Sequence, residues 1–408
     1  MFTATCRGIL QSGWCVAVLS TEVESGGMAI SQEDLTVLTA ELVAIDSTNP
    51  DLVPGGPGEA EIARFVAGWL ERAGLDVEVH ELGPSRVNVI AIARGSGAGR
   101  SLMLNAHMDV VGAGGMTEPW TPRIDGARLF GRGAYDMKAS LAAIMLVGRE
   151  AARLQLRGDV IVTAVADEEF ASIGVQAIVR HFRADAAIVT EPTGLDLCVA
   201  HKGFVWLEVE TRGVASHGSL PEEGIDAIAK MGPVLIGLAD HDRELRSRPG
   251  HTLLGPASIH ASLIQGGQEL STYPARCLLS IERRTIPGET IAEIEGQIAD
   301  ILVQAGAADS SFQAEQRTLL VRAPFGVGLD QPIVDLAQRH LMRATGREPK
   351  IVGAGGWMDS AFLAAADIPT VIFGPDGEGA HADVEWVDLV SATRTADALL
   401  GIAAEFCA

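Results

Sequence analysis

Hydrophobic and polar positions change their spacing twice along this chain. From Ser31 to Ala200, short apolar runs alternate with amphipathic stretches, a pattern typical of strands joined by crossover helices. The clearest apolar runs predict four strands, over Val87–Ala93, Ser101–Ala106, Val160–Ala166 and Ala186–Thr190. Apolar residues at helical spacing predict a helix over Ala139–Leu154. This stretch therefore predicts an α/β fold, with a mostly parallel sheet and helices on both faces.

The spacing changes at His201, where strict alternation replaces the continuous apolar runs. The predicted order is strand, helix, strand, strand, helix and strand, over 204–211, 221–238, 258–264, 276–284, 290–305 and 311–319. Such a βαββαβ unit packs two helices on a four-stranded sheet. We therefore expect an α+β domain over residues 201–314.

After Pro324 the α/β pattern returns. It predicts a helix over Pro332–Ala344, a strand over Thr370–Phe373 and a closing helix over Ser391–Phe406. The α/β domain is thus expected to be discontinuous, over residues 28–200 and 315–408, with the α+β domain inserted where both chain crossings are neighbours at the surface.

Residues 1–27 are interpreted separately. Arg7 and the apolar run after it resemble a short signal peptide, although Gln11, Ser12 and Gly13 interrupt that run. Met28 precedes Ser31, which is predicted to cap a helix, so Met28 is an alternative start. We expect residues 1–27 to form a flexible extension.

Composition adds an acidic, globular character to this picture. Hydrophobic residues make up 47% of the 408 residues and charged residues 21%, which is typical of folded proteins. The formal net charge of −22 argues against partners such as nucleic acid or an anionic membrane. No apolar run reaches the roughly 18 residues that span a bilayer. The five cysteines are widely spaced and lack a C-x-x-C pair, which favours a reducing, cytoplasmic location.

Histidines and carboxylates follow the ends of four predicted strands. These residues are His107, the adjacent pair Glu168 and Glu169, Glu191 and His381. Because ligands of open α/β sheets bind outside the carboxyl ends of the strands, we expect these side chains to converge. A glycine-rich turn over 131–138 opens the next helix and is expected to add Asp136 to the same crevice. Either histidine alone is more typical of an ordinary polar loop, but two histidines together with Asp136, Glu191 and one glutamate of the adjacent pair, five potential ligands, indicate a site.

Two imidazoles and three carboxylates suit Zn²⁺, with Co²⁺ or Mn²⁺ as alternatives, better than an iron–sulfur cluster. Five ligands are most economically shared by two metal ions, with Asp136 as the bridge. Asp109 lies two residues after His107, on the same face of an extended chain, and is expected to accept the second imidazole N–H. Successive strand residues point apart, so we assign Glu169 to a metal and Glu168 as the general base.

These residues resemble the signatures of the dinuclear zinc aminoacylase and carboxypeptidase family, which includes acetylornithine deacetylase, succinyl-diaminopimelate desuccinylase and glutamate carboxypeptidase. The resemblance rests on 104–111, 131–138, 166–169 and 379–381 with Glu385, and it extends over about Leu35–Ala404. It implies that one metal takes His107 and Glu191, the other takes Glu169 and His381, and Asp136 bridges them. It also implies that the α/β domain is the zinc catalytic domain and that residues 201–314 form a lid through which two copies dimerise.

The resemblance further implies roles for four residues outside the metal cluster. His217, in the loop 213–224, is expected to reach the partner's site and stabilise the oxyanion. Arg284 resembles the position that binds the substrate carboxylate, with its neighbour Arg283 as the alternative. Gly356 lies in a stretch that resembles the family's glycine-rich substrate loop. The chain lacks an asparagine found in many relatives, and Ser271 is expected to stand in for it.

The expected function is that of a cytoplasmic, homodimeric hydrolase with two divalent metal ions. Its small-molecule substrate would be an N-acyl amino acid or small peptide with a free carboxylate, cleaved at the amide bond with Glu168 as general base. A dipeptidase of the same family is one alternative. A metal-bearing binding protein without catalysis is the other; loss of Glu168 would favour it, and Glu168 is present.

Overall fold

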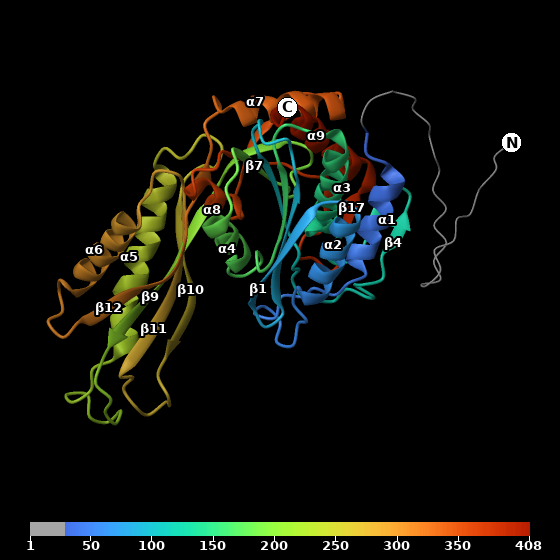
Figure 1. The fold of residues 1–408 in the computed structure, drawn as a ribbon. Helices are drawn as coiled ribbons and strands as arrows, with labels where there is room; N and C mark the ends of the chain where they lie inside the picture. The colour runs from blue at the N-terminus through green and yellow to red at the C-terminus, as the bar shows by residue number, and fades with distance from the viewer. Residues whose placement is uncertain (1–28) are drawn as a thin grey trace.

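The computed structural model describes residues 29–408 and contains three β-sheets (Figure 1). The expectations for residues 1–27, together with Cys6 and Cys15, lie outside the described residues. Within residues 29–408, no helix has both the length and the apolar character needed to cross a membrane.

The largest sheet has nine strands, in the order β1-β2-β6-β3-β7-β15-β8-β13, with β14 paired to β8. Their bounds are β1 Asp76–Gly83, β2 Arg86–Ala93, β3 Leu102–His107, β6 Val160–Val165, β7 Ala186–Val189, β8 Leu197–His201, β13 Phe325–Gly326, β14 Ile351–Ala354 and β15 Thr370–Ile372. The central strands β6, β3, β7 and β15 are parallel, and antiparallel strands extend both edges. The predicted parallel sheet is confirmed for this centre.

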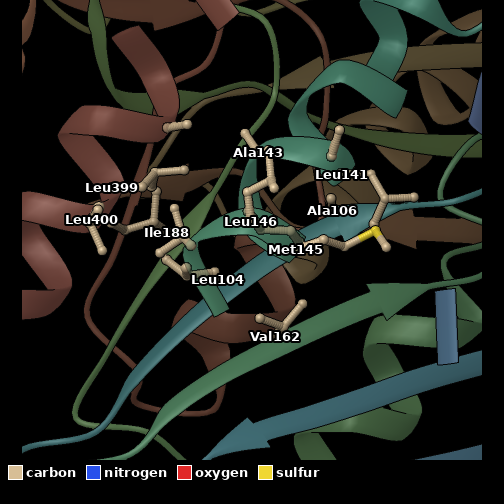
Figure 2. Close-up of a cluster of buried hydrophobic side chains, with 14 of the residues drawn as sticks. Leu104, Ala106, Leu141, Ala143, Met145, Leu146, Val162, Ile188, Leu399 and Leu400 are labelled. Atoms are coloured by element: carbon tan, nitrogen blue, oxygen red, sulfur yellow. The ribbon is translucent and has the colours of Figure 1, made fainter. Parts of the chain in front are cut away.

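Helices cover both faces of this sheet, so its central strands are buried throughout. On one face lie α1 (Gln32–Val43), α2 (Ala60–Arg72), α3 (Ala139–Leu154), α7 (Pro332–Thr345) and α9 (Leu389–Phe406), and on the other lie α4 (Ile173–His181) and α8 (Ser360–Ala365). Alternate residues of the central strands pack against the helices on opposite faces of the sheet. Leu104 contributes to the cluster with α3 and α9, where Leu146 and Leu399 also lie (Figure 2), and Met103 to the cluster with α4.

Local sequence explains the bounds of two of these helices. The α3 bounds are those predicted from its spacing of Ala, Leu, Ile and Met. Ser31 caps α1 as expected, because its side chain accepts the backbone N–H of Asp34 at 3.2 Å.

The second sheet has four antiparallel strands in the order β10-β11-β9-β12, with α5 and α6 packed on it. Its elements are β9 Gly203–Arg212, α5 Ala227–Ser247, β10 Ser258–Gly266, β11 Arg276–Thr285, α6 Ile291–Gly306 and β12 Gln313–Arg322. The predicted βαββαβ order is confirmed. We call residues 203–322 the lid unit; it projects from the side of the central sheet (Figure 1).

Three predicted boundaries in the lid unit are wrong, and one of them is the end of the helix expected over 221–238, which continues to Ser247. The helix expected over 221–238 begins only at Ala227, because the Asp226 side chain accepts the N–H groups of Ile228 and Ala229 and caps it there. The expected domain boundary between 314 and 315 falls inside β12, which remains paired with β9 as far as Arg322. The lid sheet therefore continues eight residues past the expected end at 314, to 322.

A third, small sheet connects distant parts of the chain. It consists of β4 (Arg123–Asp125), β5 (Arg128–Phe130), β16 (Gly377–Glu378) and β17 (Trp386–Asp388), in the order β16-β17-β5-β4. Phe130 pairs with Trp386, so the turn after β5, which carries Asp136, lies beside the hairpin that carries His381. Sequence spacing did not predict these strands of two or three residues.

Candidate metal centre

Four of the acidic or imidazole residues leave the carboxyl ends of adjacent parallel strands. His107 ends β3, Glu168 and Glu169 follow β6, and Glu191 follows β7. Because the strands are ordered β6-β3-β7 and run parallel, their ends bring these side chains to one edge of the sheet. The structure thus places them together, as the strand pattern predicts.

Asp136 directs its two carboxylate oxygens at two different histidines. Its Oδ1 lies 3.1 Å from His107 Nε2, and its Oδ2 lies 3.5 Å from His381 Nε2. Each histidine also faces a second carboxylate: Glu191 Oε1 is 3.7 Å from His107 Nε2, and Glu169 Oε2 is 3.0 Å from His381 Nε2. The five side chains therefore form two groups that share Asp136, which is the division that the family resemblance implies.

The hydrogen bonding of His107 indicates that a cation belongs between these groups. Its Nδ1 lies 2.9 Å from the carbonyl oxygen of Asp109, which can only accept, so Nδ1 carries a proton. In the neutral ring, Nε2 then carries a lone pair, which faces carboxylate oxygens of Asp136 and Glu191. Burial lowers the pKa of His107, but the bond to Asp136 and the nearby carboxylates outweigh it and raise that pKa well above its usual value. Either a proton or a metal cation must separate these acceptors.

The donor set and its spacing fit divalent ions. Two ligands held about 2.0–2.1 Å from a tetrahedral ion lie roughly 3.3 Å apart, and the imidazole–carboxylate separations here range from 3.0 to 3.7 Å. Glu169 Oε1 is buried and lacks a hydrogen-bond partner, so it is free to bind an ion. Loss of hydration and the neighbouring carboxylates raise the pKa of Glu191 well above its usual value, and a bound cation would relieve this repulsion.

The expected role of the Asp109 carboxylate is wrong in one respect. Its Oδ1 is 3.7 Å from His107 Nδ1, and the backbone carbonyl of Asp109 accepts the imidazole N–H instead. The buried carboxylate accepts the backbone N–H groups of Glu168 at 3.0 Å and Glu169 at 3.2 Å. Because the loop after β6 passes directly over Asp109, this carboxylate fixes that loop rather than the imidazole ring.

Behind Asp109 lies a buried polar network that sequence reasoning missed. The Asn49 side-chain amide donates to Asp109 at 2.8 Å and to Asp167 at 3.0 Å, and its oxygen accepts from Arg86 at 2.6 Å. Arg86 also pairs with Glu59 at 2.5 Å and with Asp167 at 3.0 Å. The only sequence signals were an asparagine before a proline and an arginine at the start of an apolar strand, both common without a function.

The structure brings together two of the predicted lid residues, but not at the metal cluster. β9 leaves the central sheet at Gly203 and ends at Arg212, so His217 follows the far end of that strand (Figure 1). His217 is exposed, with Nδ1 2.7 Å from Ser219 Oγ. The carbonyl of Ser271 accepts the Gly218 N–H at 2.7 Å, which holds the two loops side by side.

The remaining candidates for substrate contact differ in accessibility. Arg283 is fully buried and pairs with Glu289, whereas Arg284 is partly exposed and donates to Glu282 at 2.6 Å. Of these two arginines, Arg284 is therefore the one that a ligand can reach. Gly356 is exposed in the loop after β14.

Comparison with known proteins adds to this geometry. The sequence profile of peptidase family M20/M25/M40 matches residues 103–405. An acetylornithine deacetylase from Myxococcus xanthus is 29% identical over 393 residues, which cover 91% of this chain and 97% of that protein. An N-formyl-4-amino-5-aminomethyl-2-methylpyrimidine deformylase from Halalkalibacterium halodurans is 28% identical over 415 residues, covering 92% and 95%.

Among solved structures, the Bacillus subtilis YXEP protein, a dinuclear metal binding peptidase from the M20 family, is similar with a TM-score of 0.70. It is 17% identical, and the match covers 92% of this chain and 98% of that one. At this identity the likeness establishes the fold.

Proposed function

The chain belongs to peptidase family M20/M25/M40, a family of metal-dependent hydrolases, and we propose that it cleaves the amide bond of N-acyl amino acids with a free carboxylate. The observation that carries this proposal is the position of Asp136 between two histidines, each of which faces its own glutamate. The names of the two relatives, a deacetylase and a deformylase, both denote removal of a small acyl group. This supports a deacylase over the alternative, a dipeptidase.

Two divalent ions, for which we propose Zn²⁺, would be held by five residues and would lower the pKa of water and polarise the substrate carbonyl. The ligands are His107, Asp136, Glu169, Glu191 and His381. Glu168 lies close to His107 and Glu191, and this scheme does not use it as a ligand.

Glu168 is proposed to carry the proton. Its carboxylate lies with His107 and Glu191, with one atom of each within 4.8 Å of the others. Loss of hydration and the charge of Glu191 raise the pKa of Glu168 well above its usual value, the direction expected of a carboxylate that both takes up and releases a proton. Glu168 takes a proton from the attacking water and gives it to the nitrogen as the C–N bond breaks. The products are then a carboxylic acid and an amine.

The proposal also uses two residues of the lid unit, one of which would act from a second copy of the chain. We propose that Arg284 binds the substrate carboxylate and that His217 stabilises the oxyanion in the partner's site. The exposed position of His217, away from its own cluster, supports this arrangement. Leu263 and Ile264 on the edge strand β10 are 65% and 52% exposed, so a homodimer that pairs lid units would cover them. The free, buried cysteines among residues 29–408 support a reducing, cytoplasmic location.

The test combines metal content with turnover on one purified sample. Wild type, Glu168→Ala and the exposed control Glu71→Gln are compared on N-acetyl, N-succinyl and N-formyl amino acids and on dipeptides. We expect about two metal ions per chain in all three, and deacylation that only Glu168→Ala loses.

Two other results would redirect the proposal. Preferred cleavage of dipeptides would favour the dipeptidase. Two bound ions with no turnover on any substrate of the panel would favour a binding protein, and absence of metal under replete conditions would overturn the ligand assignment.

A further inference from the structure

Both oxygens of the buried Glu385 carboxylate accept hydrogen bonds from the turn that carries Asp136. Its Oε1 accepts the backbone N–H groups of Tyr135 at 2.9 Å and Asp136 at 3.1 Å. Its Oε2 accepts the backbone N–H of Gly133 at 3.0 Å and the Arg132 guanidinium at 2.7 Å. All four donors therefore come from one turn, and one of them is the backbone of the bridging residue itself.

Arg132 connects this turn to the second ligand loop. The side chain is buried, with one guanidinium nitrogen on Glu385 and the other 2.8 Å from the carbonyl oxygen of Ala382. Ala382 directly follows His381, whose backbone has a positive φ of 63°. The guanidinium is planar and holds its two acceptors at a fixed separation. The pair thus joins the turn of Asp136 to the loop of His381.

We propose that Glu385 and Arg132 form a positioning pair, which sets the separation of Asp136 and His381 and so determines how tightly the ion shared by Asp136, His381 and Glu169 is bound. The inference rests on the proposed two-metal site. It assigns no direct role in the reaction to either residue, because neither lies among the side chains that face the proposed ions. The other ion shares Asp136, but its further ligands His107 and Glu191 lie at strand ends that the pair does not touch, so it should be affected less.

A purely structural ion pair would behave differently. Removing one partner of a buried pair destabilises the whole fold, because it leaves an uncompensated charge. Such a loss of stability would weaken the binding of both ions to the same extent, or of neither ion. A positioning role instead weakens one ion selectively, since hydrogen bonds behind metal ligands typically contribute roughly 10–100-fold to metal affinity.

The experiment measures zinc binding to the full chain by competition with a chelator, together with urea unfolding. The variants are Glu385→Gln, Arg132→Met and Arg132→Lys. Glu289→Gln is the matched control, because Glu289 pairs with the buried Arg283 in the lid unit. We expect one of the two zinc dissociation constants, that of the ion at His381, to rise roughly 10–100-fold in Glu385→Gln and Arg132→Met. The other constant should change less than about threefold, and Arg132→Lys, which keeps the charge, should lie in between.

Further readouts separate the possible failures. At limiting zinc, kcat of Glu385→Gln should fall and recover with added zinc, whereas KM should not change. Equal weakening of both ions, or dissociation constants like those of Glu289→Gln, would overturn the positioning role alone. A wild-type chain that binds fewer than two ions would overturn the proposed function and this inference with it. If Glu385→Gln does not fold, Arg132→Lys decides the question by the same measurements.

Discussion

Asp109 and Glu385 hold opposite sides of the metal centre by the same kind of contact, but their charges are balanced differently. Each is a buried carboxylate that accepts backbone N–H groups of a ligand-bearing loop, Glu168 and Glu169 for Asp109, Asp136 and its neighbours for Glu385. Charge-assisted bonds of this kind are strong enough to fix a loop. Both sides of the site are therefore organised from behind by an acidic residue.

The difference lies in the nearest cation. Glu385 has its own guanidinium, that of Arg132 at 2.7 Å. Asp109 instead contacts the neutral amide of Asn49, and Arg86 beyond that amide is shared with several carboxylates. The position of Glu385 therefore depends on one ion pair. The position of Asp109 depends on a branched network, in which most individual contacts contribute less to stability.

The largest expected effect comes from removing the shared acceptor of the Asp109 side. Asp109→Ala leaves the backbone N–H groups of Glu168 and Glu169 and one N–H of the Asn49 amide without their acceptor, so the free energy of unfolding should fall by roughly 3–5 kcal/mol. Activity should fall at least about 100-fold, because the loop of Glu168, the proposed general base, loses its position. The measurements are urea unfolding and kcat/KM, with the exposed Asp125→Ala as control.

The same variant tests how His107 is oriented. Because the backbone carbonyl of Asp109 accepts the imidazole N–H, the ion at His107 should stay bound in Asp109→Ala. Loss of that ion from a folded variant would show that the carboxylate orients the ring after all, and would remove the distinction between the two sides.

An intermediate effect is expected at Asn49, which links Asp109 to Arg86. Asn49→Ala removes two donated and two accepted hydrogen bonds, so the free energy of unfolding should fall by about 2 kcal/mol and kcat/KM by about tenfold. Asn49→Asp, of the same size, should lower stability and kcat/KM at least as much, because a carboxylate oxygen would then face the carboxylates of Asp109 and Asp167. If Asn49→Asp behaves like wild type in both assays, the amide donor is unimportant and the network description fails.

The sequence predicted those parts of the molecule whose structure is determined locally. Strands buried on both faces have continuous apolar runs, so the sequence predicted β2, β3, β6 and β7 and the convergence of the acidic and imidazole side chains at their ends. The strands of the lid unit were predicted from another local signal, the alternation of apolar and polar residues. In each case the spacing within one segment is sufficient.

Long-range contacts account for what the sequence did not predict. The strands β5 and β17 have three residues each, and only pairing within the small sheet, including their pairing with each other across the chain, defines them. Asn49 contacts Asp167 and Arg86 through folding of the whole domain, and nothing near Asn49 in sequence indicates this. Which group of Asp109 accepts the His107 N–H, its carboxylate or its backbone carbonyl, likewise depends on the path of the loop after β6.

The smallest expected effect tests whether the charge on the Asp109 side is truly shared. Asp51 pairs with Arg86, but its side chain is 54% exposed, and such partly solvated ion pairs contribute about 0–1 kcal/mol. Asp51→Asn should therefore leave both zinc dissociation constants unchanged and lower kcat/KM less than about twofold, because Glu59, Asp167 and Asn49 still hold the guanidinium. The measurement is the same zinc competition and urea unfolding. A loss as large as that of Asn49→Ala would mean that Arg86 depends on one dominant partner, as Glu385 depends on Arg132, and the two sides of the centre would then be built alike.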